Sequence, residues 1–308
     1  MLVVSGIIPP IITPPANDDV LDVAGLERLV EHLIGNGVAG VFVLGTTGEG
    51  PSLSYRLRRE MVQTTAKILN DRVPLYVGIT DTSLVEAVNL GKFSADIGAA
   101  AVVAAPPFYF PAGQTELQHW FRRLAQSLPL PLLLYNIPAC TKIAIEAETL
   151  TALISIENII GLKDSSGNLD YLQQAIDLAS KHREGWPVLV GPEHLLAQAV
   201  SRGAAGGVAG GANLVPRLFV EVFKAASSGN AESLQKLQTQ VQQLQQLYSI
   251  GKYGSAFLKS VKCALELSGI CSGKLAPPFD AFLLPERQRV TEWMACFAST
   301  GWLPNAAV

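Results

Sequence analysis

The stretch Ile159-Ile160-Gly161-Leu162-Lys163-Asp164 is a short apolar run that ends in two charged residues. Its length and its isoleucines predict a buried β-strand. Alternate side chains of a strand point to opposite faces, so the sequence predicts Ile160 and Leu162 on one face, opposite Lys163. The strand therefore brings a lysine side chain to its carboxyl end.

Seven further apolar runs of similar length are spaced along the chain, and helix-length amphipathic segments separate most of them. The runs are Gly6–Pro14, Gly40–Gly45, Pro74–Thr80, Ala101–Pro106, Pro131–Pro138, Pro187–Pro192 and Ala205–Gly211. The clearest helical patterns are Val23–Asn36, Ser54–Asn70, Ser83–Ile97, Thr115–Ser127 and Asp170–Ser180. This alternation indicates an α/β fold with a parallel sheet buried on both faces. Eight such units predict a TIM (β/α)8 barrel. A doubly wound sheet is the alternative, although no GxGxxG motif follows the first run.

The region from about residue 230 onward has a different character. Leucine and valine recur there every three or four residues among glutamines, which predicts an amphipathic helix. Phe257–Leu267 and Glu286–Phe297 predict two more helices. We therefore expect a barrel domain over residues 1–229 and a C-terminal helical extension over residues 230–308 that packs on the barrel.

Composition limits the classes of function. The chain has 308 residues, 49% of them hydrophobic and 16% charged, with a net charge of −3. Such a chain gives no reason to expect nucleic acid or a membrane as partner, and scarce surface charge favours a homo-oligomer. The four cysteines form no CxxC pair and no zinc-type cluster, so we expect no metal site and reduced, mostly buried thiols in a cytoplasmic protein.

Lys163 is the first candidate catalytic residue. An ammonium at the end of an apolar strand loses hydration, which favours the neutral amine, and a neutral amine attacks carbonyl groups. The alternative is a structural lysine whose chain extends to solvent.

Other candidates also follow predicted strands, where the active sites of such barrels are built. Gly45-Thr46-Thr47-Gly48-Glu49-Gly50 offers backbone N–H groups and hydroxyls to a carboxylate, or forms an ordinary turn. Tyr109 and Tyr135 could transfer protons, or could pack as structural tyrosines. Glu193 and His194, after Gly191, could contact substrate hydroxyls or cap the next helix.

Three motifs together resemble the dihydrodipicolinate synthase / N-acetylneuraminate lyase family over about residues 5 to 300. They are Gly45-Thr46-Thr47-Gly48-Glu49, Tyr135-Asn136-Ile137-Pro138 and Gly161-Leu162-Lys163-Asp164. The resemblance implies a class I aldolase that forms a Schiff base between Lys163 and pyruvate or another 2-oxo acid. It also implies a homotetramer, built as a dimer of dimers, that needs no metal or organic cofactor.

The resemblance further implies a role for several residues. Tyr135 is the proton-transferring tyrosine, and Thr46 links it to a second tyrosine, matched by Tyr109, which in the synthases comes from the neighbouring subunit. Thr46 and Thr47 match the turn that binds the carboxylate, and Val208 matches a position whose backbone carbonyl lies near the lysine.

The chain departs from the family patterns at three sites. The synthases carry an arginine where this chain has Cys140, and a thiol cannot form the bidentate contact of a guanidinium with a carboxylate. The sialic acid lyases carry a serine where this chain has Gly210, and an acidic pair where it has Glu193 and His194. Because Gly191, Glu193 and Cys140 all follow predicted strands, we still expect them to contact the substrate.

An uncharged pocket around Cys140 suits a neutral aldehyde. The sequence therefore favours a 2-keto-3-deoxy sugar acid or hydroxy-oxo acid aldolase. One alternative is 4-hydroxy-tetrahydrodipicolinate (dihydrodipicolinate) synthase, and another is a non-catalytic barrel that binds a 2-oxo acid.

Overall fold

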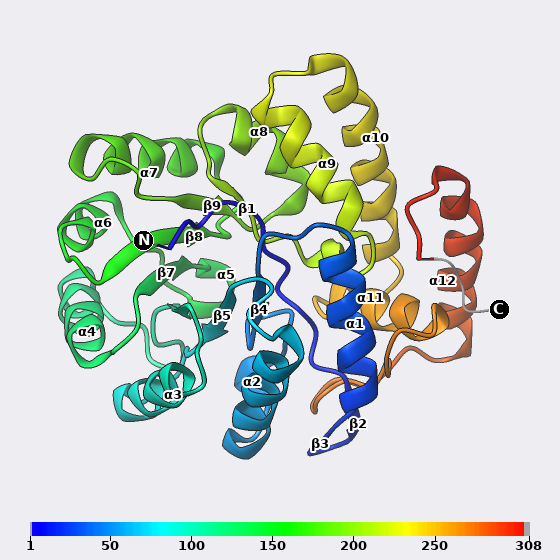
Figure 1. Cartoon of the computed structure of the whole chain (residues 1–308), viewed down its shortest axis with the longest axis horizontal. Helices are drawn as coiled ribbons and strands as arrows, with labels where there is room; N and C mark the ends of the chain where they lie inside the picture. Colours follow the sequence, from blue (N-terminus) through cyan, green and yellow to red (C-terminus); the bar gives the residue numbers. More distant parts are fainter. Residues whose placement is uncertain (1, 305–308) are drawn as a thin grey trace.

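Eight parallel strands form the centre of the molecule in the computed structural model, which describes residues 2–304. Their spatial order is β1-β10-β9-β8-β7-β6-β5-β4 (Figure 1). The strands are β1 (Gly6–Ile7), β4 (Val41–Val43), β5 (Leu75–Gly78), β6 (Ala101–Ala104), β7 (Leu132–Asn136), β8 (Ile159–Asp164), β9 (Val188–Val190) and β10 (Gly206–Gly207). The chain after β1 closes the sheet, because Pro10 pairs in parallel with Phe42 of the strand that follows. The predicted TIM (β/α)8 barrel is confirmed.

Helices surround the barrel and join its strands (Figure 1). They are α1 (Val23–Gly35), α2 (Tyr55–Leu69), α3 (Leu84–Asp96), α4 (Gln114–Ser127), α6 (Ala147–Ile154), α7 (Leu169–His182), α8 (Leu196–Ser201) and α9 (Pro216–Ser227). Several start at a polar residue whose side chain accepts a hydrogen bond from the first turn, as Ser54 and Asn168 do. Shorter elements lie in the connections: β2 (Pro15–Asn17), β3 (Val20–Leu21), α5 (Pro138–Thr141), η1 (Gly50–Ser52), η2 (Glu193–Leu195) and η3 (Gly210–Asn213).

Three further helices follow the barrel and lie against one side of it (Figure 1). They are α10 (Ala231–Tyr248), α11 (Ala256–Leu267) and α12 (Leu284–Phe297), with the short η4 (Ala298–Thr300) after them. The stripe predicted for α10 is buried: Val241, Leu244 and Leu247 belong to the same apolar cluster as the helices of the barrel. The division of the chain at residues 229 and 230 stays a prediction.

Strand β8 departs from simple alternation. Its register against β7 moves from Leu132 opposite Ile159 to Leu133 opposite Gly161, so Ile160 is the extra residue of a bulge. Ile160 packs against the apolar cluster inside the barrel, whereas Leu162 lies in the outer cluster beneath the helices. The prediction that these two side chains share a face was wrong, because the bulge interrupts the two-residue period.

The cysteines also differ in part from expectation. Cys263 and Cys271 are buried, but Cys140 and Cys296 are exposed, because they lie on α5 at the barrel mouth and on the outer helix α12. No group of three or more His, Cys, Asp and Glu side chains within residues 2–304 is arranged to hold a metal ion. In the same part of the chain, every helix is too short or too polar to cross a membrane.

Candidate active site

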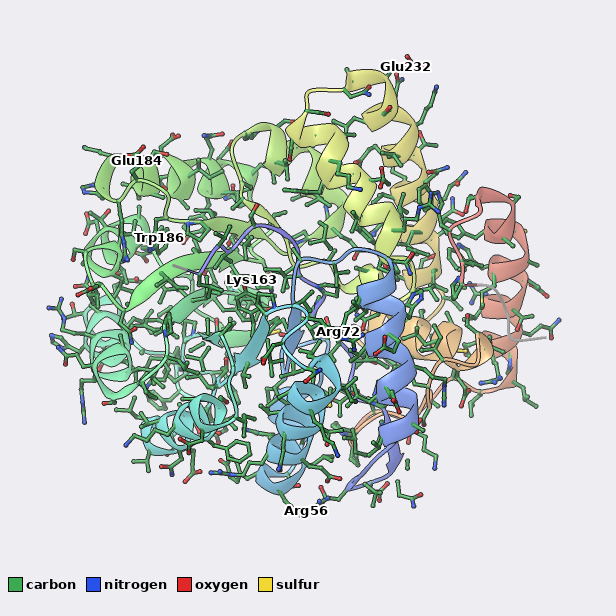
Figure 2. All side chains as sticks on the ribbon, viewed as in Figure 1. Arg56, Arg72, Lys163, Glu184, Trp186 and Glu232 are labelled. Carbon is green, nitrogen blue, oxygen red and sulfur yellow. The ribbon has the colours of Figure 1, made fainter. Side chains whose placement is uncertain are left out.

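Lys163 lies inside the barrel, near the centre of the molecule (Figure 2). Its side chain is only 5% exposed, and the ammonium donates one hydrogen bond, to Ser165 Oγ at 2.8 Å. Nζ also lies 3.5 Å from the centroid of the Tyr135 ring. Loss of hydration lowers the pKa of Lys163 to about 7, although the nearby charges of Asp164 and Cys140 oppose that shift. The neutral, nucleophilic form of the amine is therefore accessible near neutral pH.

Tyr135 comes from β7, where it is the register partner of Lys163 on β8. Its hydroxyl lies 3.2 Å from Thr46 Oγ1, at hydrogen-bonding distance. Burial raises the pKa of Tyr135 to about 12, against the opposing effect of hydrogen bonds from Thr46 and Ser165. The phenol therefore keeps its proton at neutral pH and can pass it along the pair of hydroxyls.

The turn after β4 brings Thr46 to the barrel mouth. Leu44 and Glu49 flank the threonines in the left-handed region, with φ of 59° and 55°. Such a backbone conformation is costly for residues with a side chain and persists only where the surroundings hold it. The Thr13 hydroxyl donates to Gly48 O at 2.7 Å, which is one such contact.

A cavity of about 330 Å³ opens beside Lys163. Most of the residues expected at the site line it: Thr46, Thr47, Tyr135, Lys163, Gly191, Glu193 and Val208. A second cavity of about 250 Å³ shares Thr46 and Tyr135 with the first and adds Cys140. The two cavities meet at the hydroxyl pair, so the structure gathers these residues around one amine.

Tyr109 lies apart from this group. Its side chain is 82% exposed, and it lines neither of the two cavities. A single chain therefore does not bring its phenol to Thr46. Its predicted contribution to a neighbouring subunit stays a prediction.

Glu193 is buried, and hydrogen bonds within the chain occupy its carboxylate. Its oxygens accept from Gly211 N at 2.6 Å, Gln245 Nε2 at 2.9 Å and Tyr248 Oη at 2.6 Å. Burial raises the pKa of Glu193, and these three donors oppose the shift. The contacts attach the loop after β9 to η3 and α10, so contact of Glu193 with substrate stays a prediction.

Two supporting residues were not predicted from the sequence. Ser165 is the lone hydrogen-bond acceptor of the Lys163 amine among the described residues. Asn136 donates to Asp164 Oδ1 at 2.7 Å on the outer side of the two strands, and accepts from Ile145 N at 3.0 Å. This contact fixes the end of β7 against the end of β8. The signal was present, since Asn136 directly follows Tyr135, and Ser165 lies two residues after Lys163, on the same side of an extended chain.

Comparison with known proteins identifies the family of the chain. The model of the dihydrodipicolinate synthetase family matches residues 3–295. A 4-hydroxy-tetrahydrodipicolinate synthase from Methanocaldococcus jannaschii is 32% identical over 89% of this chain and 91% of its own. A probable 2-dehydro-3-deoxy-D-pentonate aldolase from Escherichia coli K12 is 29% identical over 91% of this chain and 90% of its own.

Solved structures give the same result. A dihydrodipicolinate synthase from Bacteroides thetaiotaomicron has a TM-score of 0.93 and 47% identity, over 96% of this chain and all of its own. A prophage protein of the same family from E. coli K12, solved with pyruvate, has a TM-score of 0.91 and 27% identity, over 96% of this chain and 99% of its own. The chain therefore belongs to the dihydrodipicolinate synthetase family, whose members are lyases of the class I aldolase type.

Proposed function

We propose that Lys163 forms a Schiff base with pyruvate or a related 2-oxo acid, and that the enzyme joins this acid to an uncharged aldehyde or cleaves the product. The observation that carries the proposal is the placement of one poorly solvated amine, with a pKa of about 7, against the Tyr135 ring and beside an open cavity. The solved relative with bound pyruvate supports the choice of acid.

The residues suit each step of this chemistry. The neutral amine attacks the C2 carbonyl and water leaves, which gives an iminium on Lys163. Loss of a C3 proton then gives an enamine, which attacks the aldehyde carbon, and hydrolysis returns the amine. The hydroxyl pair of Tyr135 and Thr46 moves the protons, completed by Tyr109 of a neighbouring copy in the proposed tetramer. The N–H groups of Thr46 and Thr47 hold the carboxylate of the acid.

The aldehyde is proposed to be uncharged. Among the described residues that line the two cavities, Lys163 is the only lysine or arginine. Its amine is bonded to the 2-oxo acid in the proposed Schiff base, so it is not available to pair with a charged aldehyde. Cys140 offers no positive charge to a second carboxylate. A hydroxyaldehyde suits Ser165, His194 and Gln245, whose polar side chains line the same cavity as the amine. This supports a 2-keto-3-deoxy sugar acid or hydroxy-oxo acid aldolase, as the name of the E. coli relative also does.

The synthase reaction is the second candidate. The 47% identity to the solved Bacteroides thetaiotaomicron synthase favours it. It requires recognition of the carboxylate of aspartate semialdehyde, for which the position of Cys140 supplies no guanidinium.

Borohydride reduction in the presence of pyruvate tests the Schiff base. We expect a stable mass increase on the peptide that carries Lys163, and none in Lys163→Ala. No adduct, or an adduct on another lysine, would reject the proposed chemistry. An adduct without turnover of any aldehyde would favour the non-catalytic barrel that binds a 2-oxo acid.

A screen of aldehydes with pyruvate tests the acceptor. Neutral hydroxyaldehydes are expected to react at least tenfold faster, in kcat/KM, than aspartate semialdehyde. The reverse order would establish the synthase reaction instead. Cys140→Arg is the matched variant, and it should improve kcat/KM for the semialdehyde relative to the neutral aldehydes.

A further inference from the structure

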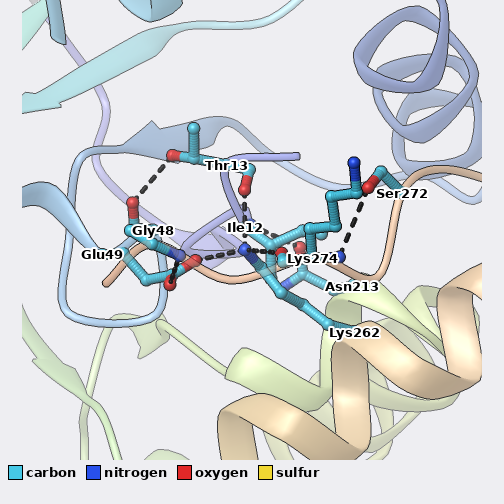
Figure 3. A network of polar contacts seen from close by, with 9 residues as sticks. Ile12, Thr13, Gly48, Glu49, Asn213, Lys262, Ser272 and Lys274 are labelled. Carbon is cyan, nitrogen blue, oxygen red and sulfur yellow. Dashed lines mark hydrogen bonds and ion pairs between the residues drawn. The ribbon is translucent and has the colours of Figure 1, made fainter. Parts of the chain in front are cut away.

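A second buried lysine lies outside the cavities, on helix α11 of the C-terminal extension. Lys262 is fully buried, with 0% exposure, and its ammonium donates three hydrogen bonds (Figure 3). The acceptors are Thr13 O at 2.8 Å, Lys274 O at 2.7 Å and a carboxylate oxygen of Glu49. Every N–H of the ammonium is therefore used, and the contacts join three segments that are far apart in the sequence.

Glu49 is the other half of this contact and belongs to the turn that carries the threonines. Its side chain is 1% exposed, its Oε1 pairs with Lys262, and its Oε2 accepts from Ala276 N at 2.7 Å. The turn is therefore held from outside the barrel by a charged group.

The strained backbone explains why the turn needs such contacts. Glu49 has a φ of 55°. The backbone of the next residue is packed closely against the start of the turn, since a Cβ on Gly50 would lie 2.2 Å from Leu44 O. Contacts on the carboxylate and on Gly48 O keep this conformation. The segment that carries Thr13 is fixed as well, because Asn213 Oδ1 accepts a hydrogen bond from Ile12 N at 3.0 Å.

We propose that Lys262 is a positioning residue that fixes the Thr46-Thr47 turn through Glu49, so that the turn can bind the carboxylate of the 2-oxo acid. This inference rests on the proposed function for the role of the turn, but not for the contact itself. Lys262 lines neither of the two cavities, so it is not placed to contact a substrate bound in them. Its effect passes through the buried carboxylate and through the Thr13 carbonyl.

Lys262→Met tests the proposal, because methionine replaces the unbranched apolar part of the side chain and removes the charge and all three donors. Backbone hydrogen exchange is followed by mass spectrometry in peptides that cover residues 44–52 and, for reference, residues 159–166. We expect exchange in the turn to accelerate at least tenfold more than exchange in β8, relative to the natural protein. The pyruvate concentration that half-saturates borohydride trapping should rise at least tenfold, with a smaller change in kcat.

Two controls separate positioning from general loss of stability. Leu124→Ala removes a fully buried side chain of α4, and Arg287→Met removes the ion pair between Arg287 and Glu266 of α11. Both should lower the melting temperature and leave turn exchange and pyruvate half-saturation within twofold of the natural values. Equal effects in Lys262→Met and Leu124→Ala at matched stability would overturn the proposal.

A double variant covers the case in which Lys262→Met does not fold. Glu49→Gln with Lys262→Met leaves no unpaired charge in the interior, so the fold is retained. We expect fast turn exchange and weak pyruvate trapping to persist, because Thr13 O and Lys274 O still lack their shared donor. Natural exchange and natural trapping in this variant would overturn the proposal. If the natural protein traps no pyruvate at Lys163, the proposed function fails, and turn exchange alone decides whether Lys262 holds the turn.

Discussion

Lys163 and Lys262 are both buried lysines of one chain, and burial lowers the pKa of each. They differ in what surrounds the ammonium. Lys163 has one hydroxyl acceptor, an aromatic face and an open cavity, whereas Lys262 has two carbonyl oxygens and a carboxylate. Burial therefore does not identify a nucleophile by itself. An amine is available for reaction when its hydrogen-bond partners are too few to hold it as an ammonium.

Replacement of Lys163 is expected to have the largest effect on activity. Lys163→Met should lower turnover by about four orders of magnitude or more, because the nucleophile is lost. The free energy of unfolding should not fall, since methionine removes an amine that is poorly paired in the interior. Steady-state kinetics and urea denaturation check both statements. A clear loss of stability would mean that Lys163, like Lys262, supports the fold.

Replacement of the Tyr135 hydroxyl comes next. Tyr135→Phe keeps the ring against Lys163 and removes the proton donor, so kcat should fall by about two to four orders of magnitude. Half-saturation by pyruvate should change less than kcat. Equal losses in the two parameters would contradict the proton-transfer role.

Replacement of Lys262 should give the opposite pattern to that of Lys163. Lys262→Met leaves the Glu49 carboxylate buried without its charge partner, which costs about 3–5 kcal/mol of unfolding free energy. Urea denaturation measures the loss. A variant as stable as the natural protein would show that the two lysines do not differ in this respect.

The pH dependence of trapping follows from the same contrast. Schiff base formation needs the neutral amine, and the pKa of Lys163 is lowered to about 7. The rate of trapping should therefore be constant above that pH and fall about tenfold per unit below it. A rate that keeps rising up to pH 10 would indicate a solvated lysine. Lys262 should show no labelling over the whole range.

The smallest expected effect concerns Ser165. Ser165→Ala removes the acceptor that favours the ammonium form of Lys163, so the midpoint of the trapping profile should move to lower pH. The rate at saturating pH should change by less than tenfold. A midpoint at higher pH would show that Ser165 does not stabilise the ammonium.

Local patterns predicted the barrel well. All eight apolar runs contain a strand, and β8 spans the whole of its predicted run, because a strand buried on both faces needs a continuous apolar sequence. The bulge at Ile160 could not be predicted, since it depends on how β8 fits β7. Lys163, Tyr135 and Thr46 were chosen as candidates because each lies near or just after the carboxyl end of a predicted strand, where parallel strands bring residues to one edge. Their roles came from the resemblance of the surrounding motifs to a known family.

Contacts across long sequence distances were beyond sequence reasoning. Glu49 and Lys262 are 213 positions apart, and nothing near either residue specifies the other. One signal was available: Leu258, Lys262 and Leu265 are spaced as one face of a helix, which places a charge on an apolar stripe. A lysine in that position needs a buried acceptor, and the sequence alone does not reveal which one.

The network around Lys262 also has a consequence for the order in which the molecule is made. Lys163 and Tyr135 leave the ribosome well before α11 and the Lys274–Ala276 segment, which complete the contacts of the turn. A nascent chain that ends short of Ala276 thus carries Lys163 without the complete set of contacts around Glu49. Under the proposed function, such a chain does not yet hold the Thr46-Thr47 turn in place to bind the carboxylate of the 2-oxo acid.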